Sequence, residues 1–159
     1  MLDTPTRLSN IASAPPYAVL DTQVVLDWLV FRDIGIAQMA RSLEGGSLRW
    51  LTCQAMNDEL EHVLNRRVFS RWMPDRATIS QIIERLALRV EAGVPPGTPL
   101  RCSDADDQIF IDLALAANAQ WLFTRDHALL RLARRAGERG VIVLRPADWQ
   151  PSMTPANSR

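Results

Sequence analysis

The sequence predicts an α/β protein built on a mainly parallel sheet. Short apolar runs typical of buried strands alternate with longer segments in which apolar residues recur every three to four positions, as they do in helices. A helical segment between successive strands is the usual crossover of parallel pairs. In sheets of this kind, binding sites lie at the carboxyl ends of the strands.

The first half of the chain contains two of these runs. Tyr17-Ala18-Val19-Leu20 is short and apolar, and it ends at Asp21-Thr22. Gly45-Gly46 is a strong signal for the end of a helix. In chain order we expect a strand over 17–20, helices from about Val24 and over 34–43, a strand over 48–53 and a helix over 54–64.

The second half continues the alternation after a basic and aromatic segment over 65–76. An apolar period of 3.6 residues predicts an amphipathic helix over 78–91, and the Pro/Gly-rich residues 93–99 predict a loop. The remaining expected elements are a helix from Ser103-Asp104 to about Asn118, a strand over 120–124, a helix from Asp126 to about Ala136, and a strand over 141–144.

The length of 159 residues fits one domain with a sizeable core. We expect a flexible leader over 1–16, the folded domain over 17–146 and an irregular C-terminal tail over 147–159. No apolar run approaches a membrane span, and the N-terminus lacks the pattern of a secretory signal. The expected location is therefore the cytoplasm.

The basic residues exclude several classes of enzyme. All 18 are Arg, so the chain cannot form a Walker phosphate loop or a Schiff base, both of which need Lys. The absence of Lys also argues against a phosphotransfer receiver domain. The two cysteines are too few for a disulfide framework. The net charge of zero requires any nucleic-acid surface to be local.

Two acidic residues stand where predicted strands end. Asp21 follows the run over 17–20, and Asp126 comes just after Thr124 at the end of the run over 120–124. Either could simply cap the helix that follows. Because the carboxyl ends of parallel strands meet at one edge of a sheet, either could instead belong to a site there.

Three further acids lie on predicted helices. Glu59 has apolar neighbours at i−3 and i+4, although burial of an unpaired carboxylate is costly. Asp104 and Asp107 are at the start of a helix, where carboxylates favour the helix dipole. Asp107 is also in register with the buried face that contains Phe110 and Ile111.

Acids gathered at one place repel each other and normally require a cation. Carboxylate oxygens favour Mg²⁺ or Mn²⁺, and such a site can activate water for hydrolysis of a phosphodiester bond. The candidate metal ligands are Asp21, Glu59, Asp104, Asp107 and Asp126.

The chain resembles the PIN-domain nucleases, in particular the toxin branch of toxin–antitoxin systems. The matching stretches are Ala18–Thr22, Glu59–Arg66, Asp104–Phe110 and Trp121–His127, in the family's order and spacing from about residue 17 to 145. The long block from Asp-x-Asp-Asp to Thr-x-Asp is the most specific part.

This resemblance implies a three-layer α/β/α sandwich and an endoribonuclease that uses Mg²⁺ or Mn²⁺. Asp21, Glu59, Asp107 and Asp126 match the family's catalytic metal-binding acids, Asp104 matches a further acid, and Thr124 matches a hydroxyl residue that orders the site. The resemblance also implies a cognate antitoxin partner and a homodimer. Our hypothesis is that Asp21, Asp107 and Asp126 hold the principal metal, with Glu59 and Asp104 binding directly or through water.

One residue departs from the family pattern. Two positions after the first Asp the family usually has Asn or Ser, whereas this chain has Gln23, which we expect to help order the site through its longer amide. Gln23 also excludes a haloacid-type phosphatase, which needs Asp there. A PIN-like module that binds RNA without cutting it remains an alternative.

The basic segment supplies candidate RNA contacts. Arg66, Arg67 and Arg71 could hold the phosphate backbone, and Trp72 could stack on a base. Arg125, next to Asp126, is a fourth candidate.

Overall fold

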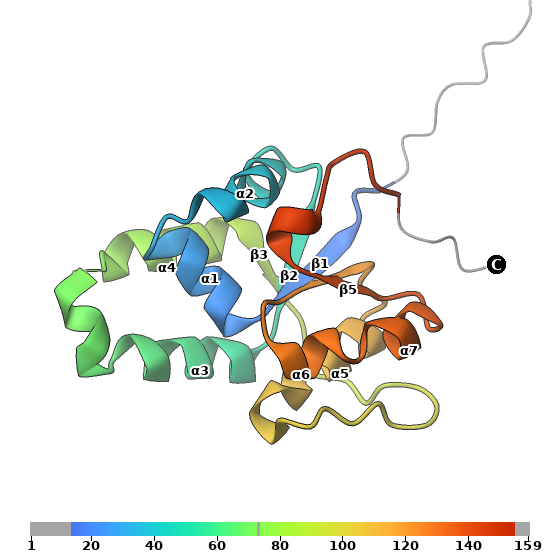
Figure 1. The fold of residues 1–159 in the computed structure, drawn as a ribbon. Helices are drawn as coiled ribbons and strands as arrows, with labels where there is room; N and C mark the ends of the chain where they lie inside the picture. The colour runs from blue at the N-terminus through green and yellow to red at the C-terminus, as the bar shows by residue number, and fades with distance from the viewer. Residues whose placement is uncertain (1–13, 73, 155–159) are drawn as a thin grey trace, which may run out of the picture.

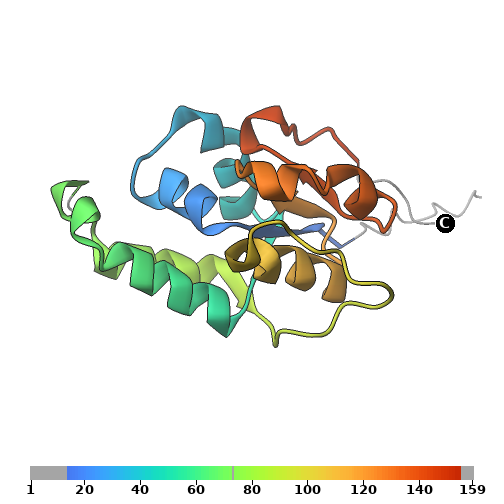
Figure 2. The same ribbon diagram turned by 60° about the horizontal axis from the view of Figure 1, so that its bottom comes forward.

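The computed structural model describes residues 14–72 and 74–154, with a parallel sheet at its centre (Figures 1 and 2). The order of the strands across the sheet is β3-β2-β1-β4-β5, and every neighbouring pair is parallel. The strands are β1 (Tyr17–Leu20), β2 (Arg49–Thr52), β3 (Ala87–Arg89), β4 (Trp121–Phe123) and β5 (Ile142–Leu144).

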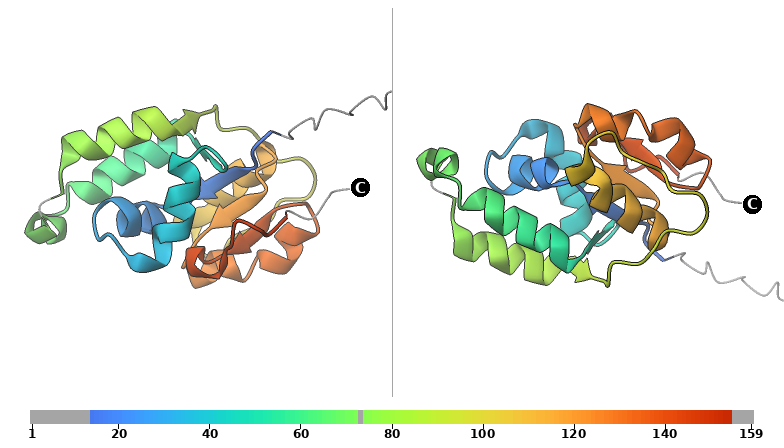
Figure 3. Two further views of the ribbon diagram at one scale, coloured as in Figure 1. Left: turned by 90° about the horizontal axis from the view of Figure 1, so that it is seen from above. Right: turned by 90° about the horizontal axis from the view of Figure 1, so that it is seen from below.

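Helices make every crossover between these strands, apart from the loop that precedes α5. The α-helices are α1 (Thr22–Leu29), α2 (Ala37–Glu44), α3 (Gln54–Leu64), α4 (Arg76–Leu86), α5 (Gln108–Ala116), α6 (His127–Leu130) and α7 (Ala133–Gly137). The 3₁₀ helices are η1 (Ile34–Ile36), η2 (Arg67–Trp72), η3 (Ala105–Asp107) and η4 (Pro146–Asp148). Figure 3 shows α3 and α4 side by side, with η2 at the tip of this hairpin, away from the sheet.

The strands bury side chains on both faces, as a sheet covered by two helical layers requires. Along β1, Ala18 and Leu20 enter a core that includes residues of α1 to α4, whereas Val19 enters a second core with residues of α5 to α7. The predicted α/β/α sandwich with a mainly parallel sheet is therefore confirmed.

The register of β1 and β4 determines which residues meet at the carboxyl end of the sheet. Val19 pairs with Leu122 and Leu20 with Phe123, so the residues that follow β1 and β4 emerge side by side. From β1 the chain proceeds to β2 and β3 on one side, and β4 and β5 lie on the other. The boundary between β1 and β4 is a topological switch point, where parallel sheets open a crevice.

The prediction of one helix over 78–91 is wrong at its C-terminal end. Helix α4 ends at Leu86, and Ala87 adopts an extended conformation that starts the edge strand β3. Pairing of Leu88 with Leu51 of β2 replaces the last helical turn. Three residues are too few to show a strand period, and the apolar side chains at 86 and 90 extend the helical period past its true end.

Other predicted elements are present with changed bounds. The helix expected over 126–136 is divided into α6 and α7, and the helix expected from residue 104 begins as η3 before α5. The tail expected to be irregular after residue 146 includes η4 and the buried Trp149, whose ring lies edge-on to Phe123 with centroids 5.7 Å apart. Most of the expected leader, residues 1–13, lies outside the described residues.

No helix within residues 14–72 and 74–154 has both the length and the apolar character needed to cross a membrane.

Candidate active site

The site is built around Asp21, directly after β1. Its backbone N–H donates to the carbonyl of Phe123 at 3.1 Å, which ties it to the end of β4. Its Oδ1 accepts the N–H of Val24 at 2.8 Å and so caps α1. Burial raises the pKa of Asp21 from 3.8 to about 6, although hydrogen bonds from Thr124 and Val24 oppose the rise. The cap and the site are therefore two roles of one carboxylate.

Thr124 links the two strand ends. Its hydroxyl donates to Asp21 Oδ2 and accepts the backbone N–H of Asp126 at 2.9 Å, and the residue is fully buried. Asp126 Oδ1 in turn accepts the N–H of Ala128 at 2.7 Å. One hydroxyl thus fixes the position of the first acid and the backbone of the last.

Asp104, Asp107 and Asp126 form the densest group of acids. One carboxylate oxygen from each lies within 4.8 Å of the others. Burial, followed by the charges of Asp126 and Asp104, raises the pKa of Asp107 from 3.8 to about 7. Asp107 Oδ2 is buried and has no hydrogen-bond partner among the described residues. An unpartnered buried oxygen beside two carboxylates fits a hard divalent cation such as Mg²⁺ or Mn²⁺.

Two of these three acids border a hollow of about 260 Å³ at the switch point. Asp107 and Asp126 line it together with Asp21 and Glu59, whereas Asp104 lies outside its lining. Glu59 Oε2 accepts the hydroxyl of Thr22 at 2.7 Å, so the first residue of α1 orients the acid on α3. Four of the five predicted ligands therefore share the hollow, and the fifth joins them through the cluster with Asp107 and Asp126.

A comparison with protein families matches residues 17–128 to the PIN domain. The chain belongs to the PIN-domain family. A comparison with curated proteins finds no match. The matched span contains every acid of the cluster and the hollow, and PIN domains are in general nucleases.

The PIN domain also contains a charged network that the sequence analysis missed. Gln23 Nε2 donates to Asp27 Oδ1 at 2.9 Å, and Asp27 is almost fully buried. Arg125 Nη1 lies 2.9 Å from Asp27 Oδ2 and 3.0 Å from Asp33 Oδ2. The network joins α1, the start of η1 and the loop between β4 and α6, so it braces the segment that holds Asp126.

The candidate RNA-binding arginines differ in their surroundings. Arg66 lines the acidic hollow, and Arg67 and Arg71 are exposed in η2. Arg125 is held by its two carboxylate partners, and this position favours a bracing role over a contact with phosphate. The RNA contacts of all four remain predictions.

A signal for the missed network is present in the sequence. Asp27 lies between Leu26 and Trp28 in an apolar segment, and a lone acid there implies a buried partner. Its partner, Arg125, is far away along the chain, so the sequence alone does not identify it.

We predict that Arg125→Gln destabilises the PIN domain by roughly 2–3 kcal/mol, because Asp27 would keep a buried charge with no cation beside it. Asp33→Asn is the matched control, since it removes the more exposed of the two acids and should cost less than ~1 kcal/mol. Urea unfolding of both variants measures this difference. If adding Asp27→Asn restores most of the stability that Arg125→Gln loses, Asp27 and Arg125 are coupled directly. Equal losses in Arg125→Gln and Asp33→Asn would contradict this coupling.

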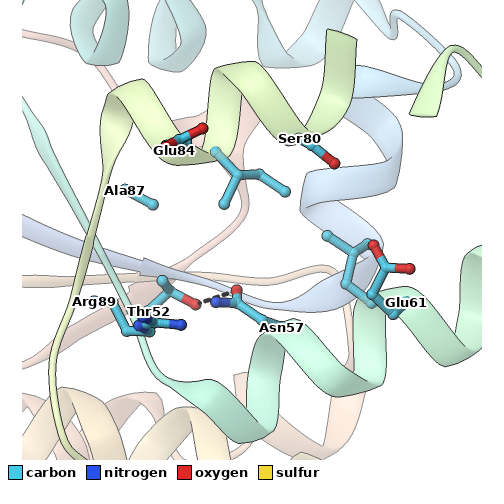
Figure 4. A pocket seen from close by; sticks show the side chains of 9 residues that line it. Thr52, Asn57, Glu61, Ser80, Glu84, Ala87 and Arg89 are labelled. Carbon is cyan, nitrogen blue, oxygen red and sulfur yellow. Dashed lines mark hydrogen bonds between the residues drawn. The ribbon is translucent and has the colours of Figure 1, made fainter. Parts of the chain in front are cut away.

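A larger hollow of about 430 Å³ lies between α3 and α4, next to the ends of β2 and β3 (Figure 4). Thr52 donates to Asn57 Oδ1 at 3.0 Å in its floor. Figure 4 shows its two acids, Glu61 and Glu84, apart from each other on different helices. It therefore lacks the convergent carboxylates of the smaller hollow, which is the better candidate for hydrolytic chemistry.

Proposed function

We propose that this PIN domain is a Mg²⁺- or Mn²⁺-dependent endoribonuclease that hydrolyses phosphodiester bonds of RNA. The observation that carries the proposal is the cluster of Asp104, Asp107 and Asp126, in which Asp107 presents a buried oxygen with no donor among the described residues. Membership of a nuclease family supports it independently.

In this proposal Asp21, Asp107 and Asp126 hold the principal metal, and Glu59 and Asp104 bind it directly or through water. The bound cation supplies a Lewis acid that lowers the pKa of a water molecule and balances charge that develops on the phosphate. Asp126 has one oxygen occupied by a backbone N–H, whereas Asp21 accepts one at Oδ1 and the hydroxyl of Thr124 at Oδ2. These bonds fix both carboxylates, and each oxygen keeps a second lone pair for a cation.

Other residues of the hollow position these groups and the substrate. The hydroxyl of Thr22 orients Glu59, and that of Thr124 orients Asp21. Arg66 places a guanidinium on the wall of the hollow, where it can donate two hydrogen bonds to a phosphate next to the acids.

The purified protein should cut a pool of mixed single-stranded and structured RNA with Mg²⁺ or Mn²⁺, and chelation should stop the reaction. Asp126→Asn should lower the rate at least ~100-fold, because it removes a charged ligand while Asn can still cap α6. Asp106→Asn, an exposed neighbour of the cluster, should cut at the wild-type rate. Cleavage that persists in chelator, or in Asp126→Asn, would contradict the proposal.

A non-cutting module that binds RNA is the second candidate, and Gln23 is the observation that favours it. Its amide nitrogen is turned toward Asp27, although the residue lines the hollow. If the wild-type protein binds RNA tightly and does not cut, Gln23→Asn should be tested for gain of cleavage.

The likeness to the toxin branch extends the proposal to a cytoplasmic toxin of a type II toxin–antitoxin pair. In that form it has a cognate antitoxin and forms a homodimer. Growth arrest on expression, relieved by a neighbouring small gene, tests the partner, and light scattering of the purified protein tests the dimer.

A further inference from the structure

Two of the walls of the acidic hollow come from helices α1 and α3. One wall is formed by Thr22, Gln23 and Leu26, which lie within about one turn of α1. The other is formed by Glu59 and Val63 of α3 and by Arg66, just beyond its end. From Glu59 to the end of α3 at Leu64 the helical rise is ~7.5 Å, so this wall runs from the carboxylates toward the tip of the α3–α4 hairpin.

Each of these two walls is followed in the chain by an aromatic residue, and the two rings contact each other. Two residues after α1 is Phe31, and η2, which follows Arg66 directly, ends at Trp72. The rings of Phe31 and Trp72 lie edge to face, with centroids 4.9 Å apart and planes at 82°. Trp72 is still 54% exposed, an unusual state for a tryptophan that already has an aromatic support.

Four arginines lie close to this pair in the chain. Arg32, Arg66, Arg67 and Arg71 are exposed, and none of them forms an ion pair with another described residue. Of the acids close by in the chain, Asp33 is paired with Arg125 and Asp75 caps α4. Arg66 shares the hollow with carboxylates, so the charge left without a carboxylate partner among the described residues is that of Arg32, Arg67 and Arg71.

We propose that this surface, which comprises Phe31, Trp72 and the four arginines, holds a single-stranded stretch of RNA that leaves the acidic hollow, with one base stacked on Trp72. This inference rests on the proposed function and adds a contact surface for the substrate outside the acidic hollow. A free indole face stacks on any unpaired base, and unpaired arginines follow the backbone. A duplex keeps its bases inward and presents none to Trp72.

The test measures binding rather than cleavage, so that it does not depend on activity. A fluorescent 12-nucleotide RNA and its duplex are titrated in chelator with the full chain carrying Asp107→Asn. We expect the single strand to bind tighter than the duplex, and Trp72→Ala to weaken single-strand binding about 10-fold. Trp72→Phe keeps a ring on Phe31 and should recover most of the affinity.

Controls separate stacking from charge and from folding. Val94→Ala removes another highly exposed apolar side chain, which lies in the loop after β3, and should leave affinity unchanged. Arg67→Gln and Arg71→Gln should each reduce the salt dependence of binding, by about 0.7 in the log–log slope. Circular dichroism must show that Trp72→Ala is folded; if it is not, Trp72→Leu, which fills the space without an aromatic face, replaces it.

The outcomes distinguish this inference from the proposed function. If Trp72→Ala weakens single-strand binding and the wild-type protein never cuts RNA, the RNA-binding surface is supported and the proposed nuclease activity is rejected. If the wild type cuts RNA with metal but Trp72→Ala binds RNA as tightly as wild type does, the proposed surface is overturned and the nuclease activity stands. A change in oligomeric state with unchanged RNA affinity also overturns it, because the rings would then serve a second copy of the chain.

Discussion

Asp107→Asn should abolish cleavage and, at the same time, make the metal-free protein more stable. The rate should fall at least ~1,000-fold, because the variant loses the one acid that combines a buried unpartnered oxygen with two carboxylate neighbours. The stability should rise because an amide in this position removes the repulsion between Asp107 and its neighbours Asp126 and Asp104. Opposite signs for activity and stability are characteristic of a functional site.

The gain in stability should depend on pH. The pKa of Asp107 is raised in the folded state to about 7, so the folded protein binds this proton more tightly than the unfolded chain does. The metal-free wild type therefore loses stability as pH rises from about 4 to 7, and the pKa of Asp21 at about 6 adds to the loss. After allowance for solvent screening, we expect the free energy of unfolding of Asp107→Asn to exceed that of metal-free wild type by roughly 1–2 kcal/mol above pH 7, or about 3–6 °C in Tm.

Thermal unfolding at pH 5 and pH 8, with and without Mn²⁺, measures these effects. In chelator, Asp107→Asn should unfold at a higher temperature than wild type at pH 8, and the difference should be smaller at pH 5, where the loss in the wild type has only begun. Mn²⁺ should stabilise the wild type and leave the variant unchanged, since ligand binding to the folded state raises Tm. Asp106→Asn should follow the wild type throughout. A variant that is less stable than wild type in chelator at pH 8 would contradict the proposed cluster.

That Asp21, Asp107 and Asp126 lie close together could be predicted, because the position of each follows from a short-range pattern; their roles remain proposals. Asp21 and Asp126 directly follow apolar runs, and a parallel sheet brings such positions to one edge. Asp107 is in helical register with Phe110, which is 1% exposed in the structure, so the helical period alone predicts that it lies on the inward side. These predictions needed only the local helical or strand period and the rule that binding sites lie at the carboxyl ends of parallel strands.

The parts that escaped prediction depend on contacts between distant segments. Strand β3 has three residues, and only pairing with β2 distinguishes it from a last turn of α4. The ion pairs of Arg125 join the loop after β4 to α1 and η1, and no periodicity reports such a pairing. The sequence also does not show how Asp104 is placed: it lies in the cluster with Asp107 and Asp126 but outside the lining of the hollow.

Thr124→Val should cost roughly 2–4 kcal/mol of stability and most of the activity. Valine keeps the shape of the side chain but neither donates to Asp21 Oδ2 nor accepts the N–H of Asp126. Two buried polar groups would then lack partners, at ~1–3 kcal/mol each, and Tm should fall by about 5–12 °C. Thr124→Ser keeps the hydroxyl, so it should lose less than ~1.5 kcal/mol and retain cleavage within about tenfold.

The pH dependence of this loss separates the hydroxyl's electrostatic role from simple packing. The hydrogen bond from Thr124 holds the pKa of Asp21 below the value that burial alone would give. Without it the carboxylate is harder to ionise, so the stability difference between Thr124→Val and wild type should be larger at pH 8 than at pH 4.5, where Asp21 is protonated in both. Urea unfolding at the two pH values measures it. A loss that is the same at both, and equal in the Ser variant, would mean that Thr124 fills space and does not order the acids.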